Sequence, residues 1–334
     1  MTNKFDKAVA AYLSDAKYRG ISKTTIDNYE KRIGYFREFL KDSEPSAEAV
    51  RAWRDALVES GKSSATVRQY LVELKAFFEF ACDEELHDIP YYTKNPVSKK
   101  LFPRVGNEGK KPYDKILDNN DIKALWMNTK QKSKGRYWAR NYAIITLLLD
   151  GKIRNAELLD IKLKDIDFEH KEITIPKGKG DKYRVVTLSD ISLSAVKLYL
   201  KSGLRPAYCT EDDYLFGTTA AHAFGENQKH SDEKWHRGTS QWLSKLVENH
   251  VKTVTGKSGF RTHSMRHNGA VIDLNTGSSL ERIQAELGHS SITTTEIYAG
   301  RLQPARHARE MDEVIAARDQ WAAENLKMLA RKNA

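Results

Sequence analysis

The sequence contains little cysteine and no long apolar run. Two cysteines, Cys82 and Cys209, among 334 residues are too few for a disulfide framework or a cysteine metal site. The longest predominantly apolar run, Tyr142–Leu149, has eight residues, whereas a membrane-spanning helix needs about 20. Residues 1–7 include no apolar segment of the kind found in a secretory signal. These absences exclude membrane-spanning, secreted and collagen-like classes, so we expect a cytoplasmic protein.

The composition is that of a globular protein with a basic middle segment. Hydrophobic residues make up 40% and charged residues 30% of the chain, and its length suggests about two domains of 100–200 residues. The net charge is +10, and residues 101–185 carry 19 basic against 12 acidic side chains. A concentrated basic segment is typical of proteins that bind a phosphate backbone. A surface that is merely basic gives the same count, so charge alone leaves both readings open.

The first hundred residues have the periodicity of helices. Apolar residues recur every three or four positions from Ile26 to Leu40, and Ser22 is suited to cap this helix. The same spacing predicts helices around 5–18, 50–57 and 67–81. We therefore expect a bundle of about four helices in residues 1–100, with lysines and arginines on its solvated faces.

The remainder divides into a linker, a second domain and a tail. Four of the eight prolines lie between residues 90 and 112; the pattern dissolves from about residue 89, and we place a basic, proline-rich linker at 101–115. A second domain is expected at 116–300, with a hairpin formed by 173–175 and 185–188 and a surface loop at 217–240. In the tail, 301–334, the segment Ala308–Leu329 is predicted to be a helix that packs on this domain or on a neighbouring molecule.

Five short patterns in the second domain carry residues suited to chemistry. They follow one another along the chain and include Arg154, Lys179, the pair His263 and Arg266 three positions apart, His289, and Tyr298. Each has an ordinary structural explanation when taken alone. The first arginine can be a surface residue paired with Glu157, the lysine a turn residue, the histidine–arginine pair a helix face, and the tyrosine a packing residue.

Together these side chains fit the transfer of a phosphodiester. Two guanidinium groups can donate to the non-bridging oxygens, whose charge grows in the transition state. A tyrosine hydroxyl can act as nucleophile in a positive environment, a lysine on a turn can protonate the leaving oxygen, and histidines can move protons. His263 and His267 have a spacing that metal sites use, but no HExxH pattern or cysteine partner accompanies them, so we expect neither metal nor cofactor.

The series resembles the tyrosine recombinase (phage-integrase) family, whose members carry a GxRxxEL box, a GKGxK turn, an HxLRH box, an LGHSS box and a TxxYxH-like terminus. The separations also fit: 3 residues from His263 to Arg266, 23 to His289 and 9 to Tyr298. The corresponding segments here are Gly151–Leu158, Gly178–Lys182, His263–His267, Leu287–Ser291 and Thr294–Tyr298.

The resemblance implies a mainly α-helical protein with a small β-hairpin or sheet in its catalytic domain. An N-terminal helical, SAM-like core-binding domain and the catalytic domain would form a clamp around DNA. The implied activity is site-specific recombination by cutting and rejoining duplex DNA through a 3′-phosphotyrosyl intermediate and a Holliday junction, without metal or ATP. The implied partners are double-stranded DNA with inverted-repeat core sites, a homotetramer on two sites, and an accessory or directionality protein.

The resemblance also assigns roles within the site. The two arginines clamp the scissile phosphate, the lysine is the general acid, the histidines assist proton transfer and phosphate binding, and the tyrosine attacks. The residues so assigned are Arg154, Lys179, His263, Arg266, His289 and Tyr298. Glu157 is expected to hold the first arginine in place rather than to contact DNA.

Two departures from the family pattern are visible, and two rival functions remain. Gly151 and Arg154 are separated by one residue more than in the usual box, so we expect a distorted turn there. Gly300 stands where many relatives have histidine. A type IB topoisomerase would use the same phosphotyrosine chemistry without partner strands, and the LGHSS box weighs against it. A non-catalytic DNA-binding regulator on the same fold is the other alternative, and the intact set of polar residues weighs against it.

Overall fold

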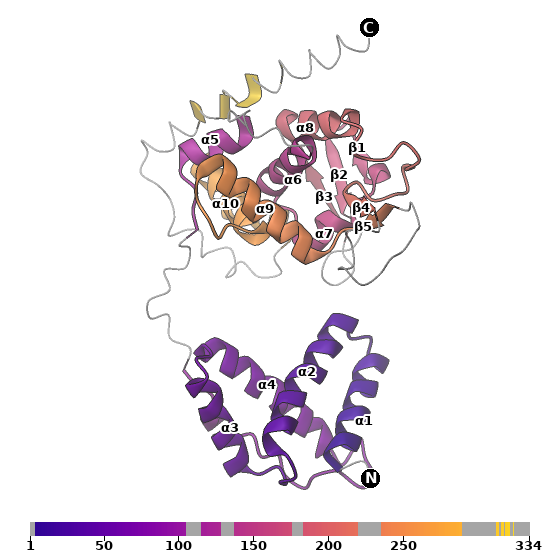
Figure 1. Cartoon of the computed structure of the whole chain (residues 1–334), viewed down its shortest axis with the longest axis vertical. Coiled ribbons are helices and arrows are strands. Elements are labelled where there is room, and N and C mark those ends of the chain that lie inside the picture. Colours follow the sequence, from indigo (N-terminus) through magenta and orange to yellow (C-terminus); the bar gives the residue numbers. More distant parts are fainter. Residues whose placement is uncertain are drawn as a thin grey trace. The chain divides into compact units, whose positions relative to one another are not determined.

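The chain forms two compact units, Met1–Lys110 and Lys111–Ala334. The computed structural model describes residues 4–104, 115–127, 137–175, 183–219 and 235–288, together with 312–313, 315–316, 318–320 and 323 near the C-terminus. Each unit has a hydrophobic core of its own. Figure 1 shows the helices and strands of each unit.

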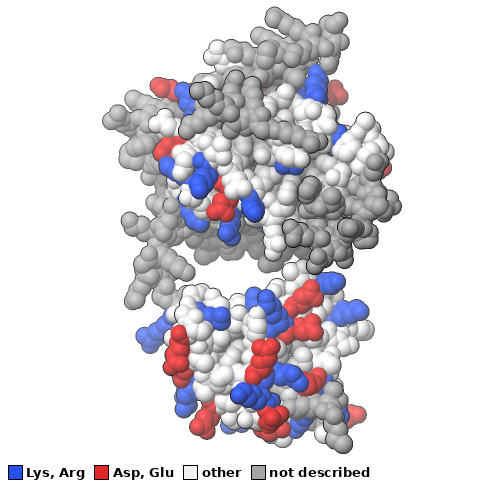
Figure 2. Space-filling view, in the orientation of Figure 1, with Lys and Arg blue, Asp and Glu red and all other residues white. Residues whose placement is uncertain are grey.

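The first unit is the predicted bundle of four helices. Its helices are α1 (Lys4–Tyr18), α2 (Lys23–Leu40), α3 (Ala47–Glu59) and α4 (Ser64–Ala81). Ser22 caps α2 as predicted, accepting a hydrogen bond from the backbone N–H of Thr25, and Ser46 and Ser63 cap α3 and α4 in the same way. The periodic apolar residues meet in a core rich in aromatic rings, among them Phe5, Phe36, Trp53, Phe77 and Phe78. Acidic and basic side chains are interspersed over the visible face of this unit (Figure 2).

The segment after α4 packs on the first unit, although the helical pattern of the sequence dissolves near residue 89. Val97 and Leu101 are buried in the bundle core, and the side chain of Asn95 donates a hydrogen bond of 3.0 Å to the Lys75 carbonyl. Prolines prevent a long helix here, but they do not prevent apolar side chains from packing. Most of the linker predicted at 101–115, namely residues 105–114, lies outside the described residues.

The second unit is built around one helix that is buried on all sides. This helix, α6 (Trp138–Asp150), contains the apolar run of the sequence, and nine of its residues are buried. It packs against α5 (Asn119–Met127), α8 (Asp190–Lys201), α9 (Ser240–Thr255) and α10 (Thr262–Asn275) (Figure 1). Two short helices, α7 (Asn155–Asp160) and α11 (Leu280–Leu287), complete the described helical part of this unit up to residue 288.

A three-stranded antiparallel sheet lies beside these helices. Its strands are β1 (Ile166–Asp167), β2 (Glu172–Ile175) and β3 (Arg184–Thr187), in the order β1-β2-β3. The register pairs Ile173 with Val186, and both side chains are buried, whereas the neighbouring Val185 is exposed. The predicted hairpin is confirmed, with its second strand one residue earlier than expected. The Gly-rich turn, 176–182, lies outside the described residues.

The predicted surface loop at 217–240 is wrong at both ends. Residues Gly217–Thr219 form β4 and Trp235–Arg237 form β5, and the two strands pair antiparallel. Gly217 is required for this pairing, because a Cβ atom there would lie 2.5 Å from the His236 carbonyl oxygen and 2.6 Å from the Trp235 ring. Residues 220–234 lie outside the described residues.

Part of the predicted C-terminal helix is described. Residues 312–313, 315–316, 318–320 and 323 are helical. Ile315 packs against the core of the second unit, and the Arg318 guanidinium lies 5.0 Å from the centre of the Trp126 ring in α5. The rest of the predicted helix Ala308–Leu329 lies outside the described residues. Among the described helices, none is both long and apolar enough to cross a bilayer.

Candidate active site

Three of the six predicted site residues are described. Arg154 precedes α7, and His263 and Arg266 lie on α10, one helical turn apart. Lys179, His289 and Tyr298 lie outside the described residues, as does most of the LGHSS box. The described segment 235–288 ends at Gly288, directly before His289. The described part of the site therefore consists of the two arginine boxes and the end of α11.

Glu157 holds Arg154 from two sides. Arg154 is the N-cap of α7, and the backbone N–H of Arg154 donates to Oε2 of Glu157 over 2.8 Å. Its Nη1 donates to Oε1 of the same carboxylate over 2.7 Å. Glu157 is buried, whereas the Arg154 side chain is 31% exposed, so the guanidinium keeps a face open to a ligand. These contacts agree with the expected holding role of Glu157.

A third arginine, which the sequence reasoning missed, shares this carboxylate. Arg184 begins β3, and its Nη2 donates to Oε2 of Glu157 over 2.9 Å. Burial lowers the pKa of Arg184, the Glu157 charge raises it and the neighbouring Arg154 lowers it, but a guanidinium so placed stays protonated at neutral pH. Its Nη1 is buried with no hydrogen-bond partner among the described residues. Its place in the sequence, two residues after the lysine-rich turn that ends at Lys182, could have indicated Arg184 as a candidate site residue.

Arg266 is more deeply buried than Arg154. Its side chain is 3% exposed, and Nη1 donates to the backbone carbonyl of Lys152 while Nη2 donates to the carbonyl of Leu287. Two backbone carbonyls, which carry no formal charge, therefore hold its guanidinium in place.

The three arginines converge on one helix end. Three consecutive backbone carbonyls at the C-terminus of α11 each accept a hydrogen bond from a different arginine: Glu286 from Arg184 (3.3 Å), Leu287 from Arg266, and Gly288 from Arg154 (2.7 Å). The last carbonyls of a helix have no partner within it and carry partial negative charge, so cations are favoured there. The boxes at 154 and 266 are thus brought together directly before His289.

Glycine is required where α11 ends. Gly288 adopts the left-handed conformation with φ +59°, and a Cβ atom there would lie 3.4 Å from Nη1 of Arg154. The glycine of the LGHSS box therefore ends the helix in a conformation that favours glycine.

The histidines of the HxLRH box form a pair. The Nε2 atoms of His263 and His267 lie 2.7 Å apart, so one ring N–H donates to the other ring, and the rings meet edge-on. Partial burial lowers the pKa of His263, and the Arg266 cation lowers it further. His263 is therefore neutral at pH 7, in the form that can both accept and donate a proton. No group of three or more His, Cys, Asp or Glu residues suited to a metal occurs in the described part of the chain.

The structure explains the unusual Gly-Lys-Ile-Arg spelling of the first box. Gly151 has an ordinary φ of −77°, whereas Lys152, two residues before Arg154, has φ +49°. Positive φ is the conformation that glycine adopts most readily, so Lys152 occupies the place of the family's box glycine. The turn before Arg154 thus contains a non-glycine residue at positive φ, two positions before the arginine.

Comparison with protein families agrees with this geometry. The model of the Phage integrase family matches residues 115–303, and that of the phage integrase N-terminal SAM-like domain matches 9–85. The chain belongs to the phage integrase family. It is a tyrosine site-specific recombinase, as its five boxes predicted.

Named relatives of this recombinase include two Xer proteins. It is 25% identical over 291 residues to tyrosine recombinase XerC of Psychromonas ingrahamii, covering 85% of this chain and 87% of that protein. It is 28% identical over 288 residues to tyrosine recombinase XerD of Chlamydia pneumoniae, covering 84% and 86%.

Solved structures share the fold of the recombinase. The XerH recombinase in a post-cleavage complex with a palindromic difH substrate matches with a TM-score of 0.65 at 23% identity, over 91% of this chain and 82% of that one. The lambda integrase dimer bound to a COC′ core site matches with a TM-score of 0.61 at 18% identity, over 87% and 94%. The mostly helical class with small sheets, predicted from sequence, is confirmed.

Proposed function

We propose that this recombinase cuts and rejoins duplex DNA through a 3′-phosphotyrosyl link to Tyr298. The observation that carries the proposal is the convergence of Arg154 and Arg266 on adjacent carbonyls at the end of α11. His289 follows that helix end directly, and Tyr298 follows nine residues later. Two guanidinium groups held by neutral carbonyls and one shared carboxylate can bind a phosphate with net positive charge.

In the proposed cleavage step, one phosphorus–oxygen bond forms as another breaks. The Tyr298 hydroxyl oxygen attacks phosphorus, the bond between phosphorus and the 5′ oxygen breaks, and Lys179 protonates that oxygen. The tyrosine proton passes to His263 or His289, since a neutral imidazole can accept it. In the reverse direction the 5′ hydroxyl of a partner strand attacks the phosphotyrosine and the tyrosine leaves. One phosphodiester is exchanged for another, so the reaction needs no ATP.

The arginines supply charge stabilisation in this step. As the nucleophile approaches, negative charge grows on the two non-bridging oxygens, and Arg154 and Arg266 donate to them. Removal of one such donor in other enzymes costs about 10²–10³ in rate. Arg184 adds a third cation beside them, bound to the same carboxylate as Arg154.

The proposed assembly is a homotetramer on two DNA sites. Each site would have inverted-repeat core sequences, with both units of each protomer on the duplex as a clamp and strand exchange through a Holliday junction. The C-terminal tail would pass between protomers, and an accessory protein would set direction. We place this activity in the cytoplasm, in association with the nucleoid.

The test is covalent capture on DNA. Nicked duplexes tiled from the DNA flanking the gene lose a short fragment after cleavage, which traps the intermediate. A denaturing gel should show a protein–DNA band with the wild type, and Tyr298→Phe should abolish it while DNA binding stays nearly unchanged.

Three outcomes would contradict the proposal. An adduct that persists in Tyr298→Phe would remove the nucleophile assignment. Tight binding to one duplex without any adduct would favour a non-catalytic regulator. Relaxation of supercoiled plasmid by a monomer at any sequence would favour a topoisomerase.

A further inference from the structure

Lys152 is unusual in both its backbone and its burial. Among the described residues, three non-glycine residues have positive φ: Lys41, Lys152 and Lys171. Lys41 and Lys171 are exposed, whereas Lys152 is only 5% exposed. A residue with a Cβ is strained in the left-handed conformation, and a buried ammonium is unfavourable unless it is paired. Contacts of the side chain must therefore outweigh both costs.

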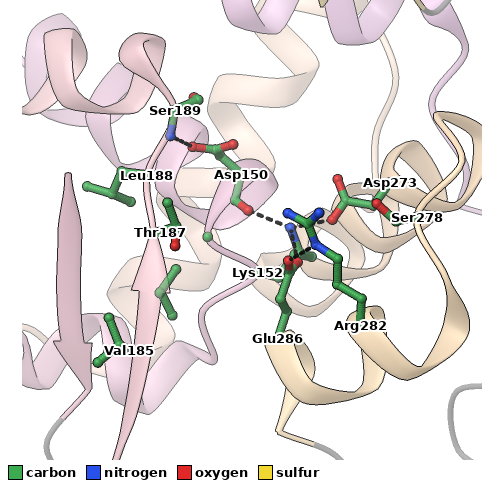
Figure 3. A pocket seen from close by; sticks show the side chains of 12 residues that line it. Asp150, Lys152, Val185, Thr187, Leu188, Ser189, Asp273, Ser278, Arg282 and Glu286 are labelled. Carbon is green, nitrogen blue, oxygen red and sulfur yellow. Dashed lines mark hydrogen bonds and ion pairs between the residues drawn. The ribbon is translucent and has the colours of Figure 1, made fainter. Parts of the chain in front are cut away.

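The Lys152 ammonium joins three helices. Its Nζ lies 2.6 Å from Oδ2 of Asp273 on α10 and 3.1 Å from Oε2 of Glu286 on α11. It also donates to the backbone carbonyl of Asp150, the last residue of α6, over 2.7 Å. Figure 3 shows that these three contacts meet at the Lys152 Nζ atom. Lys152 lines a cavity of about 270 Å³, and Arg282 lines the same cavity.

The neighbouring helix is shaped to receive this side chain. A Cβ atom on Gly269 of α10 would lie 2.0 Å from the Leu149 carbonyl oxygen and 3.0 Å from Cγ of Lys152. Only glycine at this point allows α10 to approach α6 so closely. The aliphatic part of the Lys152 side chain therefore packs against α10 at Gly269, where the helix has no side chain.

The charges around the ammonium keep it protonated. Burial lowers the pKa of Lys152, but Asp273 and Glu286 raise it by more, so that it stays above its ordinary value. Burial raises the pKa of Asp273 to about 6, against the lowering effect of Lys152. Burial also raises the pKa of Glu286, but Lys152 and Arg282 lower it by more. At pH 7 the lysine and both carboxylates are charged.

The same residue reaches both catalytic arginines through its backbone and its partners. The Lys152 carbonyl accepts from Nη1 of Arg266, and Arg154 follows two residues later in the same turn. The Glu286 side chain that Lys152 binds is one residue before Leu287 and two before Gly288, whose carbonyls hold Arg266 and Arg154. A shift of Lys152 would therefore move both guanidinium groups.

We propose that Lys152 is a positioning residue for the phosphate clamp, tying the turn that carries Arg154 to α10 and α11 so that Arg154 and Arg266 keep one arrangement. The proposal rests on the proposed recombinase chemistry and adds a residue that acts through the arginines without touching DNA. The turn that carries Arg154 is thus held by the ion pairs of Lys152 with Asp273 and Glu286.

The test removes the charge and keeps the stem. Lys152→Met should slow single-turnover adduct formation on the nicked duplex by roughly 10- to 100-fold, since a misplacement of about 1 Å can cost that much. DNA binding should change little. Lys171→Met is the matched control: Lys171 also has positive φ and an ion pair, with Asp190 at 2.6 Å, but lies in the turn between β1 and β2. This control should cleave like the wild type.

A second substrate separates positioning from general stability. A methylphosphonate at the scissile position replaces one non-bridging oxygen by methyl and removes the charge that the arginines balance. The ratio of wild-type to Lys152→Met rates should therefore shrink on this substrate. Asp273→Asn removes the partner and leaves Lys152 in place, so it should reproduce the pattern even if Lys152→Met folds poorly.

The outcomes are distinct. Equal rates for the wild type and both variants on the phosphodiester would overturn the positioning role while leaving the recombinase assignment intact. An equal loss on both substrates would assign Lys152 to folding only and also overturn it. Failure of the wild type itself to form an adduct on any duplex would overturn the proposed function and this inference together.

Discussion

Glu157 receives hydrogen bonds from two arginines of the site while its side chain is 4% exposed. In Glu157→Gln the amide keeps some acceptor capacity but loses the charge, and its NH2 group faces guanidinium donors. We expect a loss of about 2–3 kcal/mol in the free energy of unfolding, since a largely buried Arg184 is left without its counter-charge. Adduct formation should fall as well. Urea unfolding and the nicked-duplex gel measure the two effects.

Glu169→Gln is the control for this change. Glu169 is exposed in the turn between β1 and β2, and removing its charge should alter neither stability nor cleavage. A Glu157→Gln protein with wild-type stability would mean that Arg184 finds another partner, which would contradict the shared-carboxylate arrangement.

Single residues were predictable where a local pattern fixes them. The Arg154–Glu157 contact follows from a three-residue spacing at a helix start, and it was expected. The burial of Lys152 could not be expected, because lysine is ordinarily exposed and its two carboxylate partners lie more than 100 residues away in sequence. Arg184 was missed for the same reason: its partners come from α7 and α11.

Helix α9 carries a buried histidine that makes stability depend on pH. His250 is 9% exposed, its Nε2 has no partner within the described ranges, and burial lowers its pKa to about 4 from 6.5. Between these values the unfolded chain binds a proton that the folded chain does not. Stability should therefore fall as pH decreases from about 6.5 to about 4, by about 2–4 kcal/mol in total, and should not fall further on this account below pH 4.

His250→Gln tests this contribution. Other groups titrate in the same range, Asp273 with the opposite sign, so the quantity to measure is the difference in unfolding free energy between the two proteins. This difference, from urea titrations at several pH values, should be constant above pH 7 and should shift in favour of the variant as pH decreases. A difference that stays constant down to pH 4 would show that His250 protonates in the folded protein without cost.

Elements were predictable in proportion to their length and periodicity. The helices of the first unit repeat their apolar residues at helical spacing, three of them begin at serine caps, and all four were found. Strands β4 and β5 have three residues each, which is too short for an alternation of apolar and polar side chains to be recognised. The 15 residues between them also hide the pairing from the sequence. The prolines from residue 90 onward predicted the lack of a helix around Val97, but composition could not show that Val97 and Leu101 pack in the bundle core.

At the scale of the whole molecule, the C-terminal stretch differs from the rest. The two family matches end at residues 85 and 303, so residues 304–334 lie outside both. The described part of this stretch is nevertheless helical and contacts the second unit through Ile315 and Arg318. The proposal that this segment passes between protomers can therefore be tested by removing it without deleting any residue of the family matches.

Removal of residues 308–334 should separate DNA binding from assembly. The arginine clamp and the first unit remain, so binding to a duplex with one site should be nearly unchanged. Tetramers on duplexes with two sites should be strongly reduced, since we propose that this segment passes between protomers. Native gels and sedimentation with one-site and two-site duplexes measure both properties on the same protein preparations.

The truncation also removes the contact of Arg318 with Trp126, so a second variant must separate this effect from assembly. Arg318→Ala keeps the segment and deletes that contact, which is worth about 1 kcal/mol at a partly exposed site, together with the exposed Arg318–Asp319 ion pair. We expect this variant to form tetramers like the wild type. If the truncated protein formed tetramers at the same concentration as the full chain, the exchange of the tail would be refuted. If Arg318→Ala lost assembly to the same degree as the truncation, packing of the tail on its own α5 would be the cause instead.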